Sequence, residues 1–201
     1  MTWEASVGLE SEVAQLRRGD LDALTALLLR YQNRLYRYLL RIVHDQAEAE
    51  DLFQQTWIRV AEKISQFDMR RSFEPWLFAL ARNLAIDHLR RVRPSSLDEP
   101  VGTTESDITE GERLASNQRP VLDGIWERER AERLASALET LPVSYREVLS
   151  LRFEEEMKLE EIAQVLAVPL STVKTRLRRA LERMRQTLES KYPGEDWKGQ
   201  N

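Results

Sequence analysis

Six basic side chains lie close together near the carboxyl end of the chain. The segment from Ser171 to Arg185 holds them against a single acid, Glu182, although the whole chain has a formal net charge of −4. Guanidinium groups and short hydroxyls near the start of a helix can bind phosphates and read base edges in a major groove. These residue types therefore favour non-covalent binding of DNA. The expected contact residues are Ser171, Thr172, Lys174, Thr175, Arg176, Arg178 and Arg179.

The helix that carries these cations has a well-defined apolar side. Its apolar positions fall within a sector of about 100° on a helical wheel; they are Val173, Leu177, Ala180, Leu181, Met184 and Leu188. Residues 159–166 predict a short helix that packs on the same side, and Val168-Pro169 ends it before Ser171, which we expect to cap the next helix. A short helix, a tight turn and a basic helix form a helix-turn-helix that reads DNA. A basic helix face can also be simply solvated, but the preceding helix and turn favour DNA binding.

Helical spacing of apolar residues continues through the first half of the chain, and alternating strand patterns are scarce. We expect a helix from a cap at Asp20 to about residue 44, a second over 47–64 and a third over 73–92. Residues 65–72 break the pattern and are expected to form a loop. The sequence therefore predicts an all-α fold.

A second helical segment covers residues 128–192, with breaks at 141–142, 154–158 and 167–169 that delimit four helices. Between the two halves, residues 95–127 hold eight acids and two bases, few large apolar residues, and Pro, Ser, Thr and Gly. That composition predicts a flexible acidic linker.

The predicted organisation is thus two small helical domains, 12–94 and 128–192, joined by the acidic linker. The acidic residues of the linker offset the positive charge of two basic surfaces, so the net charge of the whole chain does not reveal these surfaces. The tail after residue 192 is expected to be frayed.

Several classes of function are disfavoured. The chain has no cysteine and two histidines, so disulfides, thiol catalysis and thiolate metal sites are excluded, and we expect no metal and no cofactor. Paired catalytic carboxylates, a nucleophile motif and a phosphate loop are missing, so we expect neither an enzyme nor a small-molecule substrate. The first residues do not form a signal peptide and no window is apolar enough to insert into a membrane, so we expect a cytoplasmic protein.

The chain resembles the extracytoplasmic-function group of bacterial sigma factors, which belong to the sigma-70 family. Five segments, in the order and spacing of the family, carry the resemblance. They are DQAEAEDLFQQTW (45–57), FEPWLFALARNLAIDHLRR (73–91), LPVSYREVLSLR (141–152), EEIA (160–163) and TVKTR (172–176). The ordered set covers both halves of the chain and is far more specific than any one segment.

The resemblance implies a subunit that binds core RNA polymerase and carries it to promoter DNA. Residues 12–94 would be sigma region 2, and an acidic, amide-bearing helix face with Leu52 as its apolar anchor would dock on the polymerase. An ordinary solvated helix is the competing interpretation for each residue alone. The polymerase-binding residues would be Glu48, Glu50, Asp51, Leu52, Gln54 and Gln55.

The loop 65–72 and the helix after it resemble the part that melts and reads the minus-ten element. Melting needs a pocket for an unstacked base, a stacking surface and cations for the single strand. Trp76 could act as a base wedge, although its spacing favours the core, and Phe73 remains open between the two roles. The minus-ten residues would be Phe67, Arg70, Arg71, Arg82, Asn83, Arg90 and Arg91.

Residues 128–192 would be sigma region 4, whose helix-turn-helix reads the minus-thirty-five element. The linker would thread through the polymerase, and an inert tether would have the same composition. By analogy with the family, an anti-sigma factor is an expected partner. The rival hypothesis is a helix-turn-helix regulator that acts alone, with an N-terminal sensing domain.

Five positions depart from the family pattern. Glu156 and Lys158 stand where Gly and a capping Ser are common, and Ala167 and Ser171 replace two glycines. Ala167 would be strained if its φ were positive. Gln55 replaces an acid, which would soften polymerase docking.

Overall fold

The computed structural model describes residues 3–92 and 122–193, and every regular element in these two ranges is a helix. This confirms the expected all-α fold. Most of the expected linker and the tail after residue 193 lie outside the described residues.

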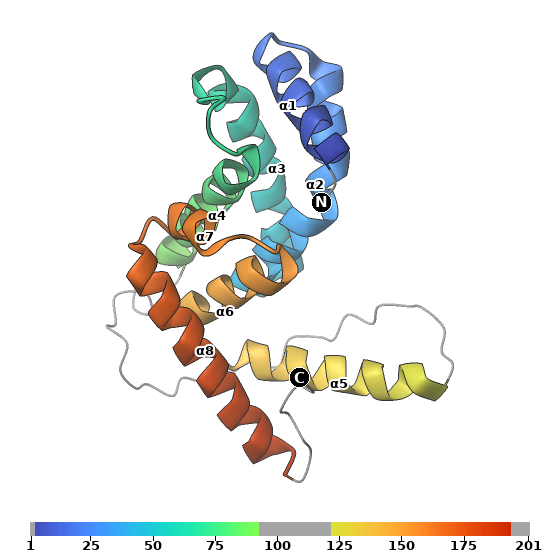
Figure 1. The fold of residues 1–201 in the computed structure, drawn as a ribbon, viewed down its shortest axis with the longest axis vertical. Coiled ribbons are helices and arrows are strands. Elements are labelled where there is room, and N and C mark those ends of the chain that lie inside the picture. Colours follow the sequence, from blue (N-terminus) through green and yellow to red (C-terminus); the bar gives the residue numbers. More distant parts are fainter. Residues whose placement is uncertain (1–2, 93–121, 194–201) are drawn as a thin grey trace.

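The first half contains four α-helices and a short 3-10 turn (Figure 1). The Asp20 carboxylate accepts a hydrogen bond from the Asp22 N–H at 2.9 Å, and His44 closes the same helix with φ 60. Asp45 caps the following helix by accepting from the Glu48 N–H at 2.9 Å. These caps confirm the predicted helix starts. The elements are α1 (Trp3–Arg17), α2 (Leu21–Val43), α3 (Gln46–Lys63), η1 (Ile64–Gln66) and α4 (Phe73–Val92).

Helix α1 was not expected from the sequence. Its Val13 and Leu16 are buried against the other helices, and Leu9 packs beside them, so the three form one stripe at helical spacing. The core of this half is completed by the inward sides of α2, α3 and α4. Its largest fully buried side chains are Leu27, Tyr31, Leu35, Tyr38, Leu39, Leu52, Val60, Leu77 and Phe78.

The second half contains the four predicted helices. The first of them begins at Leu122, six residues before the helix start expected near residue 128. A short π-helix continues the second helix before the chain turns. The elements are α5 (Leu122–Glu139), α6 (Val143–Leu149), the π-helix η2 (Ser150–Glu154), α7 (Leu159–Leu166) and α8 (Leu170–Lys191).

The two halves lie against each other in the described residues. Helix α7 packs along α4, and α6 packs against α2 (Figure 1). Buried side chains from both halves join in one apolar cluster. Helix α8 extends away from this junction with α5 beside it. The arrangement leaves much of α8 in solvent and covers one side of α4.

Candidate nucleic-acid and polymerase interfaces

The turn between α7 and α8 has the geometry of a helix-turn-helix. Helix α7 ends at Ala167, whose φ is 52, and the Val168 N–H donates to the Ala163 carbonyl at 3.1 Å. The Pro169 carbonyl accepts the first hydrogen bonds of α8, so Pro169 occupies the cap position. Ser171 therefore lies in the first turn of the helix and does not cap it, which corrects the expectation from the sequence.

This half of the molecule makes its turns without glycine. Ala167 and Glu156 both have a left-handed backbone, with φ of 52 and 55, and such residues cost about 1–3 kcal/mol each. At the start of α7, the Glu161 carboxylate accepts from the Lys158 N–H at 2.8 Å and satisfies one exposed donor in place of a capping Ser. The chain thus accommodates these departures from the family pattern, with backbone strain at Glu156 and Ala167.

The outward side of α8 carries the expected DNA-reading residues. Ser171, Lys174, Thr175, Arg178 and Arg179 are exposed. The remaining two are half-buried; they are Thr172 and Arg176. The structure therefore brings all seven to the first turns of one helix.

A shallow hollow of about 290 Å³ lies beside the start of α8. Five of the expected residues line it together with Tyr145, a residue of α6 that the sequence did not single out. Tyr145 itself is only 4% exposed. Its position in an apolar segment gave no signal of this role. The lining residues are Tyr145, Ser171, Thr172, Thr175, Arg176 and Arg179.

The cations of α8 are weakly held. Arg178 is 71% exposed and its Nη1 lies 3.8 Å from Glu182, an ion pair of little strength at the surface. Lys174 and Arg179 make no ion pair with another described residue. These residues thus offer exposed positive charge close to a helix N-terminus, which suits phosphates and base edges.

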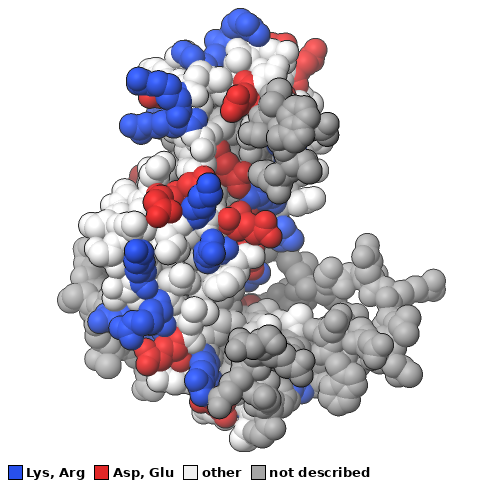
Figure 2. All heavy atoms as spheres, in the orientation of Figure 1, with Lys and Arg blue, Asp and Glu red and all other residues white. Residues whose placement is uncertain are grey.

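A second basic area lies around the loop before α4. Arg70 is 89% exposed, and its guanidinium donates to both oxygens of Asp68 at 3.0 Å. These hydrogen bonds lower the pKa of Asp68. Arg71 is exposed on the same loop. Figure 2 shows Lys and Arg gathered over this end of the molecule and again along α8, with mixed charges between them.

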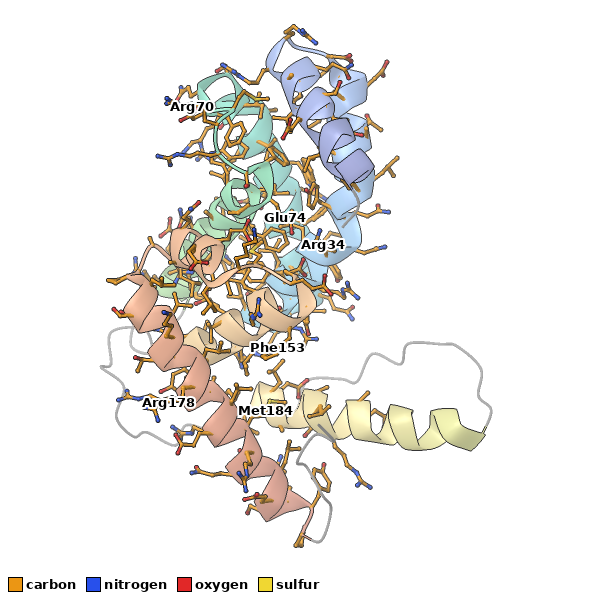
Figure 3. The ribbon with its side chains drawn as sticks, viewed as in Figure 1. Arg34, Arg70, Glu74, Phe153, Arg178 and Met184 are labelled. Carbon is orange, nitrogen blue, oxygen red and sulfur yellow. The ribbon has the colours of Figure 1, made fainter. Side chains whose placement is uncertain are left out.

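Helix α4 carries three more of the expected residues, farther from the loop along its length. Asn83, Arg90 and Arg91 are exposed, and Arg91 Nε donates to the Asp87 carbonyl at 3.2 Å. Arg70 and Arg178, labelled in Figure 3, lie toward opposite ends of the molecule in that view. Arg70 of the loop and Arg178 of α8 therefore belong to separate surfaces.

Phe67 differs from the role expected for it. Its ring is 4% exposed and packs between Phe73, with centroids 5.9 Å apart, and Trp76, at 4.9 Å. In this arrangement Phe67 offers no open face for a base and belongs to the core. Phe73 is buried as well, and Trp76 packs partly buried against the core, as its spacing predicted.

Arg82 also differs from the expectation of an exposed cation. Its side chain is 17% exposed, and its Nε donates to Glu147 of α6 at 2.8 Å. Burial raises the pKa of Glu147, and the neighbouring Arg82 opposes the rise. The sequence could not predict this pair, because its partners are far apart along the chain.

The face expected to bind polymerase is formed on α3. Glu50, Asp51, Gln54 and Gln55 are exposed on it. Glu48 is half-buried, with its Oε1 3.1 Å from His88 Nε2.

The apolar member of that face is not the one the sequence suggested. Leu52 is 2% exposed and packs in the core, so it cannot serve as a surface anchor in this arrangement. Ile58 is 58% exposed and lies one turn beyond Gln54 and two turns beyond Asp51. The helical spacing of Ile58 from Asp51 and Gln54 was the sequence signal that could have identified it.

The described residues offer neither a metal site nor a membrane-spanning helix. Within residues 3–92 and 122–193, no group of three or more His, Asp and Glu side chains could hold a metal ion. The helices described here are too short or too polar to cross a bilayer.

Comparison with known families gives two matches, one for each half. Residues 27–94 match Sigma-70 region 2, and residues 131–184 match Sigma-70 region 4. Together they span both basic areas and the face on α3.

Individual relatives agree over nearly the whole length. The chain is 33% identical over 181 residues to the ECF RNA polymerase sigma factor SigW of Bacillus subtilis (strain 168), covering 90% of this chain and 96% of that protein. Among solved structures, CnrH in complex with the cytosolic domain of CnrY is similar with TM-score 0.65 and 24% identity, covering 90% of this chain and 97% of that one. The sigma factor RpoE in complex with the anti-sigma factor NepR from Bartonella quintana has TM-score 0.63 and 24% identity, covering 82% and 96%. At these identities the two structures establish a shared fold.

The two matched regions, the near-complete alignment with a curated relative and the helix-turn-helix with its basic outward face lead to one conclusion: the chain belongs to the extracytoplasmic-function sigma factors of the sigma-70 family.

Proposed function

We propose that this sigma factor directs core RNA polymerase to its promoters by contacting DNA through two separate surfaces. The observation that carries the proposal is the pair of exposed basic areas, one on α8 and one on the loop 65–72 with α4. The protein would act in the cytoplasm, without covalent chemistry of its own. Its useful affinity would come from polymerase holding both surfaces on one promoter.

The minus-thirty-five element is assigned to α8. Arg178 and Arg179 point into solvent from the outward side, where a guanidinium can bind O6 and N7 of guanine together. Lys174 is placed to bind a phosphate. The hollow beside Tyr145 gives room for a sugar-phosphate unit next to Ser171 and Thr172.

The minus-ten element is assigned to the loop and to α4. Arg70, Arg71, Arg90 and Arg91 supply exposed cations for a single strand, and Asn83 can hydrogen-bond a base. Arg82 joins them only when it is released from Glu147. Phe67 supports the loop from within and is left out of the contact set.

Polymerase docking is assigned to the exposed side of α3. Glu50, Asp51, Gln54 and Gln55 would meet a basic, polar surface, and Ile58, one turn beyond Gln54, would supply its apolar contact. Interfaces with a desolvated apolar centre and a polar rim gain most of their affinity from the centre. Substitution of Ile58 by Asp is therefore expected to weaken core binding more than substitution of Gln54 by Ala.

The direct experiment is transcription from genomic promoter fragments with core polymerase, with and without this protein. We expect defined transcripts only when the protein is present, and none with core polymerase alone. If the protein instead binds duplex operators tightly by itself and never supports initiation, it is a stand-alone regulator.

An anti-sigma factor is proposed as a further partner. The solved relative RpoE was determined with the anti-sigma factor NepR, and CnrH with the cytosolic domain of CnrY. Affinity purification of the tagged protein from cells is expected to return core polymerase and a second, smaller partner. Repeated recovery of polymerase alone would count against the second partner.

A further inference from the structure

We propose that the free protein is held closed by a set of interdomain ion pairs, and that this closed form withholds part of the minus-ten surface until polymerase separates the two domains. The set, termed the interdomain clasp, joins three arginines of the first half to three glutamates of the second. Its members are Arg34, Arg41, Arg82, Glu147, Glu154 and Glu155. The withholding step rests on the proposed role of Arg82 in DNA binding; the closure itself does not.

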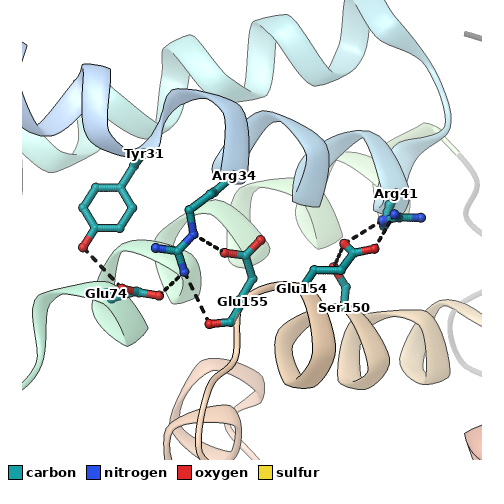
Figure 4. A network of polar contacts seen from close by, with 7 residues as sticks. All are labelled: Tyr31, Arg34, Arg41, Glu74, Ser150, Glu154 and Glu155. Carbon is teal, nitrogen blue, oxygen red and sulfur yellow. Dashed lines mark hydrogen bonds and ion pairs between the residues drawn. The ribbon is translucent and has the colours of Figure 1, made fainter. Parts of the chain in front are cut away.

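The first part of the clasp lies on α2. Arg34 Nε donates to Glu155 Oε2 at 2.7 Å, and its Nη2 contacts the Glu155 carbonyl at 3.4 Å and the carboxylate of Glu74 (Figure 4). Two turns further on, Arg41 Nε donates to Glu154 Oε2 at 2.8 Å. Two adjacent carboxylates of the second half are thus held by two arginines on one side of one helix.

Local structure in the second half turns these carboxylates toward α2. The chain forms a π-helix over Ser150–Glu154, and the Ser150 hydroxyl donates to Glu154 at 2.8 Å. Glu156 follows with a left-handed backbone, φ 55. Single π turns and left-handed non-glycine residues are uncommon and concentrate at functional sites. Here both flank the two acids that reach the other domain, and Glu155 is only 5% exposed.

The second part of the clasp lies between α4 and α6. Glu147 is 2% exposed and faces Arg82 at 2.8 Å, while Arg146 and Arg176 are near enough to act on its charge. Glu147 thus interacts with one arginine from each of the two proposed DNA surfaces, Arg82 for the minus-ten element and Arg176 for the minus-thirty-five element. A DNA strand cannot reach Arg82 while this pair is buried.

The clasp suits a reversible closure. Taking charges out of water offsets most of the attraction between them, so buried ion pairs fix a geometry more than they add stability. The apolar contacts of α7 on α4 and of α6 on α2 add to the closure. A partner that offers competing contacts to both domains can therefore open the molecule.

The test uses the full chain, free in solution, and reads the distance between domains. The sequence has no cysteine, so Lys63→Cys on α3 and Gln186→Cys on α8 provide two exposed sites for a fluorophore pair. In this background we compare Arg41→Glu, Glu154→Arg and the double exchange. Arg59→Glu, which breaks an exposed pair with Glu62 inside α3, is the matched control.

Each single charge reversal places like charges opposite each other and should raise the ratio of open to closed molecules by about tenfold. The double exchange should return the ratio to within about twofold of the parent, and Arg59→Glu should leave it unchanged. Circular dichroism confirms that each variant is folded. A parent protein that is already open, single variants that move no more than the control, or an exchange that fails to restore closure would each overturn the proposal.

A second readout addresses Arg82 directly and needs neither DNA nor polymerase. Phenylglyoxal modifies accessible arginines, and mass spectrometry reports the rate at each one. In the parent, Arg82 should react at least about tenfold more slowly than Arg70, whose side chain is 89% exposed, and its rate should rise in Arg41→Glu and fall again in the exchange. Equal rates at the two arginines in the parent would refute the withholding of Arg82.

Core polymerase is then added to the labelled parent. Loss of the closed distance upon binding supports the clasp as a gate, and retention of that distance in the bound complex overturns it. Failure of the protein to bind core polymerase at all, seen by gel filtration, would instead overturn the proposed function while leaving the closure measurement intact.

Discussion

The two basic surfaces differ in how freely their cations can move. On α8, Lys174 and Arg179 stand in solvent with no ion-pair partner among the described residues. On the other surface, Arg70 is tied to Asp68 and Arg82 is enclosed against Glu147. Under the proposed function, α8 would bind DNA in the closed form, whereas the proposed minus-ten surface would become complete only after the domains part.

Packing explains the difference. Helix α8 is covered by α6 and α7 on its apolar side and leaves its basic side open. Helix α4 is packed by α2 and α3 within its own half and by α7 from the other half, so part of its polar side is enclosed as well. The same residue type therefore serves as a free cation on one helix and as a buried partner on the other.

The largest expected effect comes from Arg82→Ala. Removing the arginine leaves Glu147 buried without its main partner, which costs the closed form about 3–5 kcal/mol. The domains are expected to separate, and the first urea transition of the labelled protein should move to lower concentration. Arg70→Ala, which breaks an exposed pair, should leave that transition in place. Equal behaviour of the two variants would remove the distinction between a free and an enclosed arginine.

Substitutions of the exposed cations on α8 are expected to change DNA binding and not the closure of the domains. Arg179→Ala should weaken binding to the cognate minus-thirty-five duplex by about 1–3 kcal/mol if its guanidinium pairs with guanine, and relax the choice of base there. Lys174→Ala should weaken binding to all sequences alike. It should also reduce the slope of the logarithm of the binding constant against the logarithm of salt concentration by about one. Fluorescence anisotropy titrations at several salt concentrations measure both. Uniform loss in Arg179→Ala would make that residue a phosphate contact.

Backbone strain gives a smaller effect, confined to the helix-turn-helix half. Ala167→Gly removes a left-handed residue with a Cβ and should raise the free energy of unfolding by about 1 kcal/mol. The same substitution at Ala163, inside α7, should lower it by about 1 kcal/mol. Urea denaturation of the two variants measures the difference. Destabilisation by both would mean that the turn relaxes in solution.

The smallest expected effect is a pH dependence of closure. Burial raises the pKa of Glu147, and Arg82, Arg176 and Arg146 oppose the rise. Because the closed form then binds this proton more tightly than the open form, closure is favoured as pH falls through the raised pKa. The gain is complete below the ordinary value of about 4.3 and is lost as pH rises.

The labelled protein tests this as the pH is lowered from 7.5 toward the ordinary value of about 4.3, by comparing the parent with Glu147→Gln. The parent should shift toward the closed distance at the lower pH, and the Gln variant should shift less. An identical shift in both proteins would assign the effect to other groups.

Local signals in the sequence were sufficient for the helices. Asp20 caps its helix as expected, and the apolar stripe of α8 points inward at Val173 and Ala180. Helix α1 was missed because its apolar stripe is short and acids lie within it. The fold class and the helix-turn-helix followed from helical spacing, whereas the cap expected at Ser171 was wrong.

The candidate sites were less predictable because burial depends on neighbours that are distant in the chain. Leu52 and Phe67 lie in segments rich in polar residues, yet their side chains turn into the core. Ile58 turns outward from the same helix as Leu52. Arg82 meets a glutamate 65 positions away, and no local pattern encodes such a pair.

The π-helix at Ser150–Glu154 has a consequence for insertions and deletions. A π turn is equivalent to an α-helix that has gained one residue, so deletion of one residue within it would restore regular α-helix. Because the π turn already absorbs the extra residue, the residues beyond such a deletion would face the same side as before. Removal of one residue from the regular helix α6 would instead rotate the residues beyond it by about 100° around the helix axis and turn Glu154 and Glu155 away from α2. The π-helix thus marks the point where this helix can change length by one residue and keep its contacts with the other domain.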